Sequence, residues 1–141
     1  MELQITFPGG KRVDAHFMGQ TVYTDQSRAA GGEGSAPEPY MHFLASIGTC
    51  AGIYVLGFCQ ARGIPTEGIE LTQRMEFDRP THRLARVEVE IRTPPSFPDK
   101  YLPAIRRAAD LCAVKKAILD PPEFEVTAVK SAETSTARAA G

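Results

Sequence analysis

Residues 39–65, PYMHFLASIGTCAGIYVLGFCQARGIP, decide the fold of this chain. The run has no Asp, Glu, Lys or Arg before its last turn, and Gly63 and Pro65 favour a helix C-cap and prevent further helix. Its nearly uncharged stretch from Met41 to Cys59 would also suit a membrane span, but that stretch contains His42 and three glycines, and the amphipathic strands around it would otherwise have no core. We therefore predict the buried central helix of a globular protein over about residues 39–62.

Short runs of alternating apolar and polar residues flank this helix and predict β-strands. Before it, two runs joined by the turn Pro8-Gly9-Gly10 predict a hairpin, and a third strand completes a meander. After it, two longer runs predict a hairpin with one face in water. The predicted strands are residues 3–7, 13–17, a short one near Val22, 69–77, 84–92, and a short final strand from Phe124 to Lys130. The expected fold class is α+β, with one domain over residues 1–130 and a flexible tail over 131–141.

A second helix is predicted from about Pro98 to Leu119, with a proline near its first turn, where proline is tolerated. Cys112 falls on the same helical stripe as Leu102 and Ile105, so we expect its side chain to point inward. Residues 25–38, DQSRAAGGEGSAPE, have the composition of a loop. Because this loop is longer than most connections in compact domains, we expect it to be functional.

Composition limits the possible classes of function. A chain of 141 residues, 43% hydrophobic and 23% charged, is typical of one soluble domain. Lys and Arg number 16 against 17 Asp and Glu, without blocks of like charge, so neither nucleic acid nor a membrane surface is expected as a partner. The N-terminus does not read as a secretory signal. Three cysteines, an odd number, favour free thiols in a reducing cytoplasm over a disulfide framework.

The three cysteines differ in their surroundings. Cys50 and Cys59 lie nine residues apart on the central helix and point to opposite faces, so they cannot bond to each other. Free cysteine usually behaves as a small buried hydrophobe, and we interpret Cys59 in this way. The glycine-rich loop offers backbone N–H groups near Cys50, and Lys115 and Lys116 stand one turn from Cys112, where they favour a thiolate. A thiol redox site formed by Cys50 and Cys112 is therefore the leading hypothesis.

Two further features bear on the site. Gly48 and Gly52 lie one turn apart on the central helix, so another backbone can approach this face closely, and a dimer axis is one candidate. His16, His42 and His82 have no metal-ligand spacing to each other or to the cysteines. We therefore predict no metal site and no bound cofactor.

The segment TDQSRAAGGEGSAPEPYMHFLASIGTCAGIYVLGFCQARGI resembles the signature of the OsmC/Ohr family, the osmotically induced and organic-hydroperoxide-resistance proteins. The matching elements are Gly31-Gly32, the helix entry Pro37-Glu38-Pro39, Cys50, and the later helix around Cys112. The resemblance implies an OsmC/Ohr-like fold in an intertwined homodimer, with active sites near the subunit interface. It also implies that Cys50 attacks a hydroperoxide and becomes a sulfenic acid, that Cys112 resolves it as a disulfide, and that an external dithiol reductant resets the pair.

The chain departs from the pattern of the peroxidase members at the helix entry. Those members carry a glutamate just after the second proline, where this chain has Tyr40 and Met41. They also carry an arginine after the first Gly-Gly turn, for which Arg12 is the candidate and Arg28 the other option. The carboxylate partner of that arginine would have to be rebuilt from Glu38 or Glu33, and the proline that usually follows the second cysteine is Ala113. These departures place the chain nearer the broad OsmC-like branch than the dedicated hydroperoxide reductases.

Two hypotheses from different classes follow. The first is a thiol peroxidase that uses Cys50 and Cys112 on an organic hydroperoxide. The second is a non-catalytic domain of the same fold that binds a small apolar ligand in a dimer-interface pocket beside Cys50. A Cys50–Cys112 crosslink after brief peroxide treatment would support the first hypothesis, and inert thiols would support the second.

Overall fold

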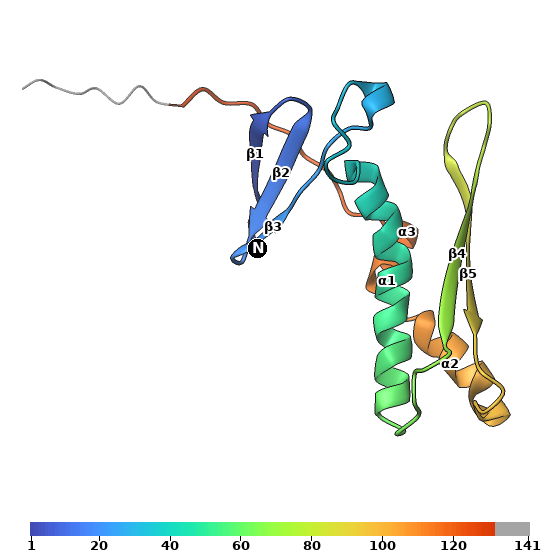
Figure 1. Ribbon diagram of the computed structural model, residues 1–141. Helices are drawn as coiled ribbons and strands as arrows, with labels where there is room; N and C mark the ends of the chain where they lie inside the picture. Colours follow the sequence, from blue (N-terminus) through green and yellow to red (C-terminus); the bar gives the residue numbers. More distant parts are fainter. Residues whose placement is uncertain (132–141) are drawn as a thin grey trace, which may run out of the picture.

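The computed structural model of the protein describes residues 1–131, which form two antiparallel sheets and three α-helices (Figure 1). The three-stranded sheet lies to one side of the long helix α1, and the two-stranded sheet lies to the other. In chain order the elements are β1 (Gln4–Gly9), β2 (Arg12–Phe17), β3 (Gln20–Val22), the 3-10 turn η1 (Arg28–Ala30), α1 (Pro39–Gln60), β4 (Glu70–Phe77), β5 (Leu84–Arg92), the 3-10 turn η2 (Asp99–Tyr101), α2 (Leu102–Ala109) and α3 (Ala113–Leu119).

The first sheet is the predicted meander, in the order β1-β2-β3. A polar ladder crosses it, because the ring of His16 on β2 hydrogen-bonds Thr6 on β1 and Thr21 on β3, at 2.9 and 3.0 Å. Its outer strand leaves apolar side chains in solvent, with Ile5 51% and Phe7 80% exposed. This sheet therefore lacks, within one chain, the apolar layer that a half-buried sheet normally packs against.

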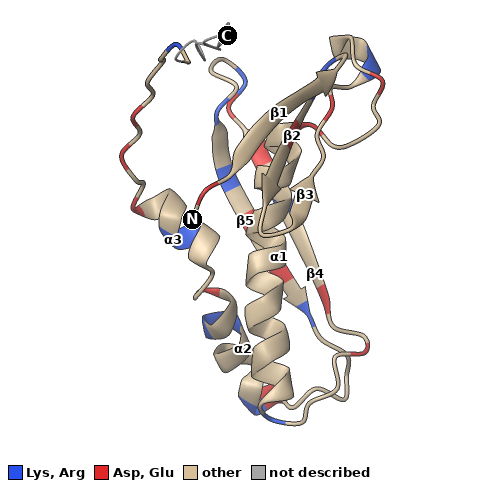
Figure 2. Cartoon of the chain, turned by 90° about the vertical axis from the view of Figure 1, so that its left-hand side faces the viewer, with Lys and Arg blue, Asp and Glu red and all other residues tan. Residues whose placement is uncertain are grey.

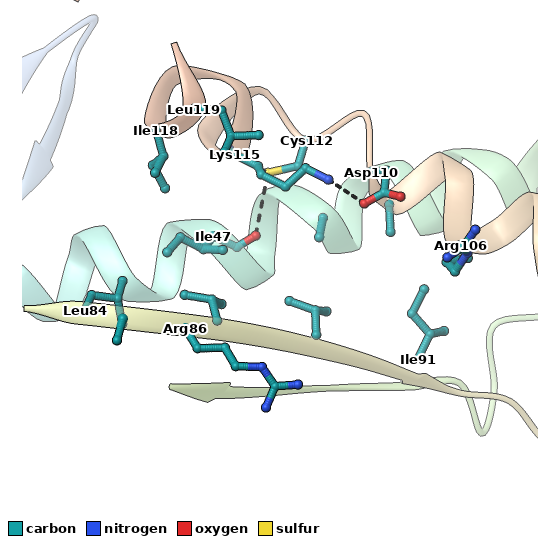
Figure 3. A pocket seen from close by; sticks show the side chains of 15 residues that line it. Ile47, Leu84, Arg86, Ile91, Arg106, Asp110, Cys112, Lys115, Ile118 and Leu119 are labelled. Carbon is teal, nitrogen blue, oxygen red and sulfur yellow. Dashed lines mark hydrogen bonds and ion pairs between the residues drawn. The ribbon is translucent and has the colours of Figure 1, made fainter. Parts of the chain in front are cut away.

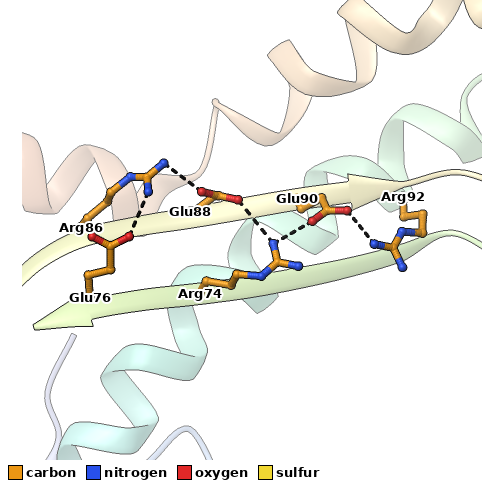
Figure 4. Close-up of polar contacts among 6 residues, drawn as sticks. All are labelled: Arg74, Glu76, Arg86, Glu88, Glu90 and Arg92. Carbon is orange, nitrogen blue, oxygen red and sulfur yellow. Dashed lines mark hydrogen bonds and ion pairs between the residues drawn. The ribbon is translucent and has the colours of Figure 1, made fainter.

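The second sheet is the predicted hairpin of β4 and β5, and its two faces differ as expected. Leu71, Gln73 and Met75 are half-buried and alternate with exposed polar residues. The outer face carries a ladder of ion pairs in which each arginine meets glutamates beside or across from it (Figure 4). The pairs are Arg74 with Glu88 and Glu90, Arg86 with Glu76 and Glu88, and Arg92 with Glu90, at 2.7 to 3.3 Å. Exposed pairs each contribute little stability, but the alternating signs favour this one strand register.

Helix α1 packs along one stripe, formed by Leu44, Ile47, Ala51, Val55 and Cys59. The stripe meets α2, α3 and the inner face of the hairpin, which agrees with its prediction as the central helix. By length and composition alone α1 could also cross a membrane. The core continues at the C-terminal end of α1, where Phe97 and Ile105 pack against the stripe.

The close packing predicted at the glycine face of α1 is made with β4 of the same chain, and a dimer axis at this face stays a prediction. A Cβ at Gly48 would lie 2.7 Å from the Gln73 side-chain oxygen, and one at Gly52 would lie 4.0 Å from the side chain of Leu71. Gln73 uses the space at Gly48 to donate its amide to the carbonyl of Leu44 on α1, at 2.9 Å. The absence of a side chain at Gly48 thus allows a polar contact between helix and sheet.

The prediction of one continuous helix from Pro98 to Leu119 carrying Cys112 is wrong. A 3-10 turn precedes α2, and the helical run ends at Ala109, so Cys112 lies at a corner before α3. Cys112 still points inward and is 2% exposed, as predicted from its stripe. The break is stable because the free backbone groups at the start of α3 find other partners, described below.

The predicted final strand, Phe124 to Lys130, is also not a strand in this structure, because no strand among residues 1–131 pairs with it (Figure 2). The segment has strand-like alternation, but Phe124 and Val126 are 87% and 94% exposed. A lone extended segment has no partner for its backbone hydrogen bonds, so the sequence pattern alone cannot form a strand. Apart from Ser131, the predicted tail lies outside the described residues.

The buried carboxylate of Asp25 organises the long loop between β3 and α1. It accepts hydrogen bonds from the backbone of Gln26, Glu33 and Ser35 and from the Ser35 hydroxyl, at 2.7 to 3.3 Å. These bonds, those of Ser35 first, lower the pKa of Asp25 to about 2. Gly32 is required here, because a Cβ at this position would lie 2.1 Å from the carbonyl oxygen of Gln26.

The pKa of Asp25 predicts how acid affects the fold. Because that pKa is lower in the folded chain than the ordinary value of 3.8, ionised Asp25 stabilises the fold fully above about pH 4, and this contribution is lost as the pH falls toward about 2. Asp25→Asn should therefore lower the free energy of unfolding at neutral pH, and the difference from wild type should shrink in acid. Urea unfolding at several pH values measures this, with the exposed Glu33→Gln as control. Equal stability of Asp25→Asn and wild type at neutral pH would contradict it.

Candidate functional site

Cys50 and Cys112, the two cysteines of the hypothesised thiol site, lie near each other, since the Cys112 side chain is among the groups that lower the pKa of Cys50. Cys50 is half-buried on α1, one residue from the packed stripe, and Cys112 is buried at the corner between α2 and α3. Their side chains are within hydrogen-bonding reach, and both are free thiols. One sulfur is therefore open to solvent, and the second lies beside it inside the protein.

Cys112 is the N-cap residue of α3. Its φ of −45° and ψ of 118° are non-helical, and its sulfur accepts a hydrogen bond from the backbone N–H of Lys115 at 3.4 Å. Its carbonyl accepts from Lys116, and its own N–H donates to Ala109 at 3.3 Å. On the other side the thiol can donate to the carbonyl of Ile47 on α1, at 3.7 Å (Figure 3). Cys112 thus joins α1 to the start of α3.

The sulfur of Cys50 faces the remaining free amides of α3. Hydrogen bonding from the N–H of Val114, then from the Cys112 thiol and the N–H of Ala113, lowers the pKa of Cys50 against the opposing effect of burial. Two of the N–H groups that the start of α3 leaves without intrahelical partners have hydrogen bonds in the structure: that of Cys112 donates to the Ala109 carbonyl, and that of Lys115 donates to the Cys112 sulfur. Those of residues 113 and 114 act on Cys50, where they lower the pKa of the thiol.

Cys59 behaves as predicted for a structural cysteine. It is fully buried in the core with Val55, Phe97 and Ile105. Burial raises the pKa of its thiol, with Arg62 opposing this weakly. A buried thiol with a raised pKa is a poor nucleophile, so the reactive chemistry of this chain falls to the other two cysteines.

A cavity of about 490 Å³ opens beside Cys112, between the inner face of β5 and the helices (Figure 3). Its lining is mostly apolar, with charged side chains at the rim, where Lys115 forms an ion pair with Asp110. The lining residues are Ile47, Ala51, Leu84, Ala85, Arg86, Val87, Val89, Ile91, Arg106, Ala109, Asp110, Cys112, Lys115, Ile118 and Leu119. Such a cavity suits a small apolar molecule better than a small hydrophilic one.

Arg12 and Arg28, the predicted thiolate-activating residues, are not brought to Cys50 within one chain. Arg12 forms an ion pair with the buried carboxylate of Asp14 at 2.6 Å and stacks near the ring of Tyr23. Arg28 donates from Nε to the carbonyl of Glu33 at 3.3 Å. Neither guanidinium is among the groups that shift the pKa of Cys50.

The carboxylate partner of Arg12 also differs from the prediction. It is Asp14, two residues along the same strand, whereas Glu38 accepts a hydrogen bond from the backbone of Ser27. The backbone N–H groups of the glycine-rich loop that were expected near Cys50 are directed at Asp25 instead. The predicted loop amides are thus replaced at Cys50 by those of α3.

Sequence reasoning did not find the contribution of the backbone at residues 113 and 114, or the cavity cation Arg106. The available signal was Asp110-Leu111-Cys112, because a helix that restarts needs an N-cap and cysteine can serve as a weak one. Lys115 was noted for its charge, but its ammonium group pairs with Asp110, and it is its backbone N–H that contacts Cys112. Within residues 1–131, no three His, Cys, Asp or Glu side chains converge to hold a metal ion.

Comparisons with known proteins identify the family and the fold of the chain. A family model described as OsmC-like protein matches residues 32–127. A crystal structure from Psychrobacter arcticus 273-4, provisionally named an osmotic stress induced and detoxification response protein, is similar with a TM-score of 0.64 at 23% identity, covering 82% of this chain and 85% of that chain. An organic hydroperoxide resistance protein OsmC from Legionella pneumophila, described as a predicted redox protein and regulator of sulfide bond formation, gives 0.53 at 18% identity, covering 84% and 89%. At these identities the structures share the fold alone. A search of curated proteins found no match.

The lowered pKa of Cys50 predicts selective thiol chemistry. Alkylation of the native, reduced protein by iodoacetamide at increasing pH should modify Cys50 with a midpoint below the ordinary pKa of a thiol, while Cys59 reacts only after unfolding. Ionised Cys50 should also stabilise the fold, fully above that ordinary value and progressively less as the pH falls through the folded pKa. Cys59→Ala should keep the low midpoint. A Cys50 midpoint at or above that of a free thiol would contradict the arrangement.

Proposed function

Because the chain belongs to the OsmC-like family of redox proteins, we propose that it reduces organic hydroperoxides with Cys50 and Cys112 as its catalytic residues. The observation that carries this proposal is the convergence of an accessible thiol of lowered pKa with a second, buried thiol. No bound cofactor is needed for this chemistry. The free thiols also fit a reducing compartment, and we place the protein in the cytoplasm.

The proposed reaction has three steps. The Cys50 thiolate attacks the terminal oxygen of the hydroperoxide, the O–O bond breaks, and the alcohol leaves after taking up a proton. Cys50 is then a sulfenic acid, which the Cys112 thiol attacks to form a disulfide and release water. A dithiol reductant restores both thiols by exchange and is itself oxidised to a disulfide. Two electrons pass from the dithiol to the peroxide in each cycle.

The α3 amides support the first step. Val114 and Ala113 direct N–H groups at the Cys50 sulfur, so they favour the thiolate before the attack. Cys112, the residue that would later resolve the sulfenic acid, can also lower the pKa of Cys50, but its one S–H proton then goes to the Cys50 sulfur in place of the Ile47 carbonyl. Tyr40 and Met41, both half exposed, stand where peroxidase members carry a glutamate, and neither has a carboxylate. Activation by backbone amides would explain how this chain could work without that glutamate.

The cavity is lined by Cys112 and not by Cys50, and its character is compatible both with an organic substrate and with the alternative function. Its apolar walls suit the organic group of a hydroperoxide, with the charged rim toward water. The same walls would suit a non-catalytic role in which a small apolar ligand binds and the cysteines do not turn over. The two functions differ in whether peroxide is consumed.

Turnover of a hydroperoxide tests the proposal. The reduced protein should consume tert-butyl hydroperoxide in the presence of dithiothreitol, and Cys50→Ser should reduce the rate to background because it removes the nucleophile. Cys59→Ala is the matched control and should retain the rate. Mass spectrometry after brief peroxide treatment should find a loss of two hydrogens mapped to a Cys50–Cys112 crosslink. Unchanged turnover in Cys50→Ser would reject the peroxidase, and inert thiols would favour the ligand-binding alternative.

We also propose that the protein is a homodimer. Ile5 and Phe7 on β1, and Phe124 and Val126 in the strand-patterned C-terminal segment, are exposed in the single chain. Both sheets also have open edges. Exposed apolar strands with open edges tend to pair with another chain. A second copy would supply the layer that the first sheet lacks, and assignment of Arg12 or Arg28 to the thiol site is a prediction that depends on that copy.

Sedimentation velocity tests the assembly. Wild type should sediment as a dimer, and Phe124→Asp combined with Val126→Asp should shift it toward the monomer, because charges would replace the apolar side of the added strand. The matched control changes the other side of the same segment, Glu123→Gln with Glu125→Gln, and should leave the dimer intact. A monomeric wild type at micromolar concentration would contradict the proposal.

A further inference from the structure

We propose that Cys112 has a second role, as a redox-dependent cap of α3, so that formation of the Cys50–Cys112 disulfide releases the first turn of α3 and opens one wall of the cavity. The inference deepens the proposed function, because it rests on the same pair of thiols. It concerns what oxidation does to the fold, which is separate from the identity of the oxidant.

The first support is the position of the reduced sulfur. In the thiol form, the Cys112 sulfur accepts the Lys115 N–H at 3.4 Å while its S–H can donate to the Ile47 carbonyl at 3.7 Å. The backbone of Cys112, with φ −45° and ψ 118°, is non-helical, as the backbone of an N-cap residue is. Two independent contacts, one to α3 and one to α1, thus depend on where this single sulfur atom lies.

The second support is the chemistry of the disulfide. When the Cys112 sulfur attacks the sulfenic acid of Cys50, an S–S bond forms, the S–O bond breaks, and water leaves with the Cys112 proton. The S–H donor to Ile47 is then gone. The negative charge on the Cys50 sulfur, which the N–H groups of residues 113 and 114 stabilise, is gone as well. An S–S bond of about 2.05 Å also fixes the position of both sulfurs, which removes the freedom of Cys112 to keep its cap geometry.

The third support is that little else holds α3. It has seven residues and none of them is buried. An isolated helix of this length is unstable in water, so α3 depends on its contacts at the N-terminus. The ion pair of Lys115 with Asp110 is exposed, with side-chain exposures of 39% and 59%, and such pairs contribute little. Residues 121–131 after α3 have no regular structure to anchor it.

The consequence reaches the cavity and the disulfide. Lys115, Ile118 and Leu119 of α3 form one wall of the cavity beside Cys112. If α3 loosens on oxidation, that wall moves, and the otherwise buried Cys112 sulfur becomes accessible to a dithiol. The reduced enzyme would thus keep the resolving thiol protected, and only the oxidised enzyme would expose it to the reductant.

Hydrogen exchange on the full chain tests this. Diamide, which oxidises thiol pairs without a peroxide, should form the Cys50–Cys112 disulfide and speed exchange of the Lys115 and Lys116 amides by about fivefold or more, the size of a typical N-cap loss. Cys50→Ser treated in the same way is the control and should not change. In the reduced state, Cys112→Ala should speed exchange at the same amides, whereas Cys112→Asn, a strong cap without redox chemistry, should keep them slow.

Each outcome decides the inference separately from the peroxidase. It is overturned if diamide forms no Cys50–Cys112 disulfide, if the disulfide forms while α3 exchange is unchanged, or if Cys112→Ala exchanges like wild type. A protein that opens α3 with diamide but consumes no hydroperoxide would retain the redox-dependent cap and lose the peroxidase proposal.

Discussion

The hydrogen bonding of the first turn of α3 is the constraint on which the rest of the site depends. A helix start leaves backbone N–H groups without partners, and an unsatisfied one costs about 1–3 kcal/mol when it is buried. Here the sulfurs of Cys50 and Cys112 take the place of the usual oxygen cap. The helix α3 is thereby fixed next to α1, its side chains form one wall of the cavity, and the two thiols are held together. Fold and chemistry therefore share the same few atoms.

This arrangement gives the thiol a different source of activation from the one the family pattern suggests. A guanidinium brings a full charge but needs a carboxylate to orient it. The guanidinium of Arg12 already forms an ion pair with buried Asp14. Backbone amides bring partial charges that need no such partner, because the helix itself orients them. They act over a short range, so the effect is confined to Cys50 and does not reach the buried thiol of Cys59, whose pKa burial raises.

The sequence was sufficient to predict the elements whose pattern is local. It was insufficient where contacts with residues distant in the chain determine the structure. The period of α1 and the alternation of β4 and β5 were predictable, because each depends on which face is apolar. The inward direction of Cys112 followed from its stripe even though the helix around it breaks. The break itself was missed, because its stabilising contacts come from Cys50, which is 62 residues away in the chain. Arg12 was assigned to the thiol site because it follows a glycine turn. In the structure its guanidinium instead pairs with the carboxylate of Asp14, two residues further along the same strand.

The two faces of the β4–β5 hairpin limit how a second copy could add to this chain. The outer face carries the ladder of Arg and Glu side chains, and burying it would remove water from six charged groups that now satisfy each other. The inner face is already used by α1 and the cavity. The strand edges remain open, and the segment from Phe124 to Lys130 has strand alternation but pairs with none of these edges within residues 1–131. Pairing at an edge would satisfy that backbone while leaving the ladder in water, so the charges on the sheet and the unpaired segment favour the same mode of assembly.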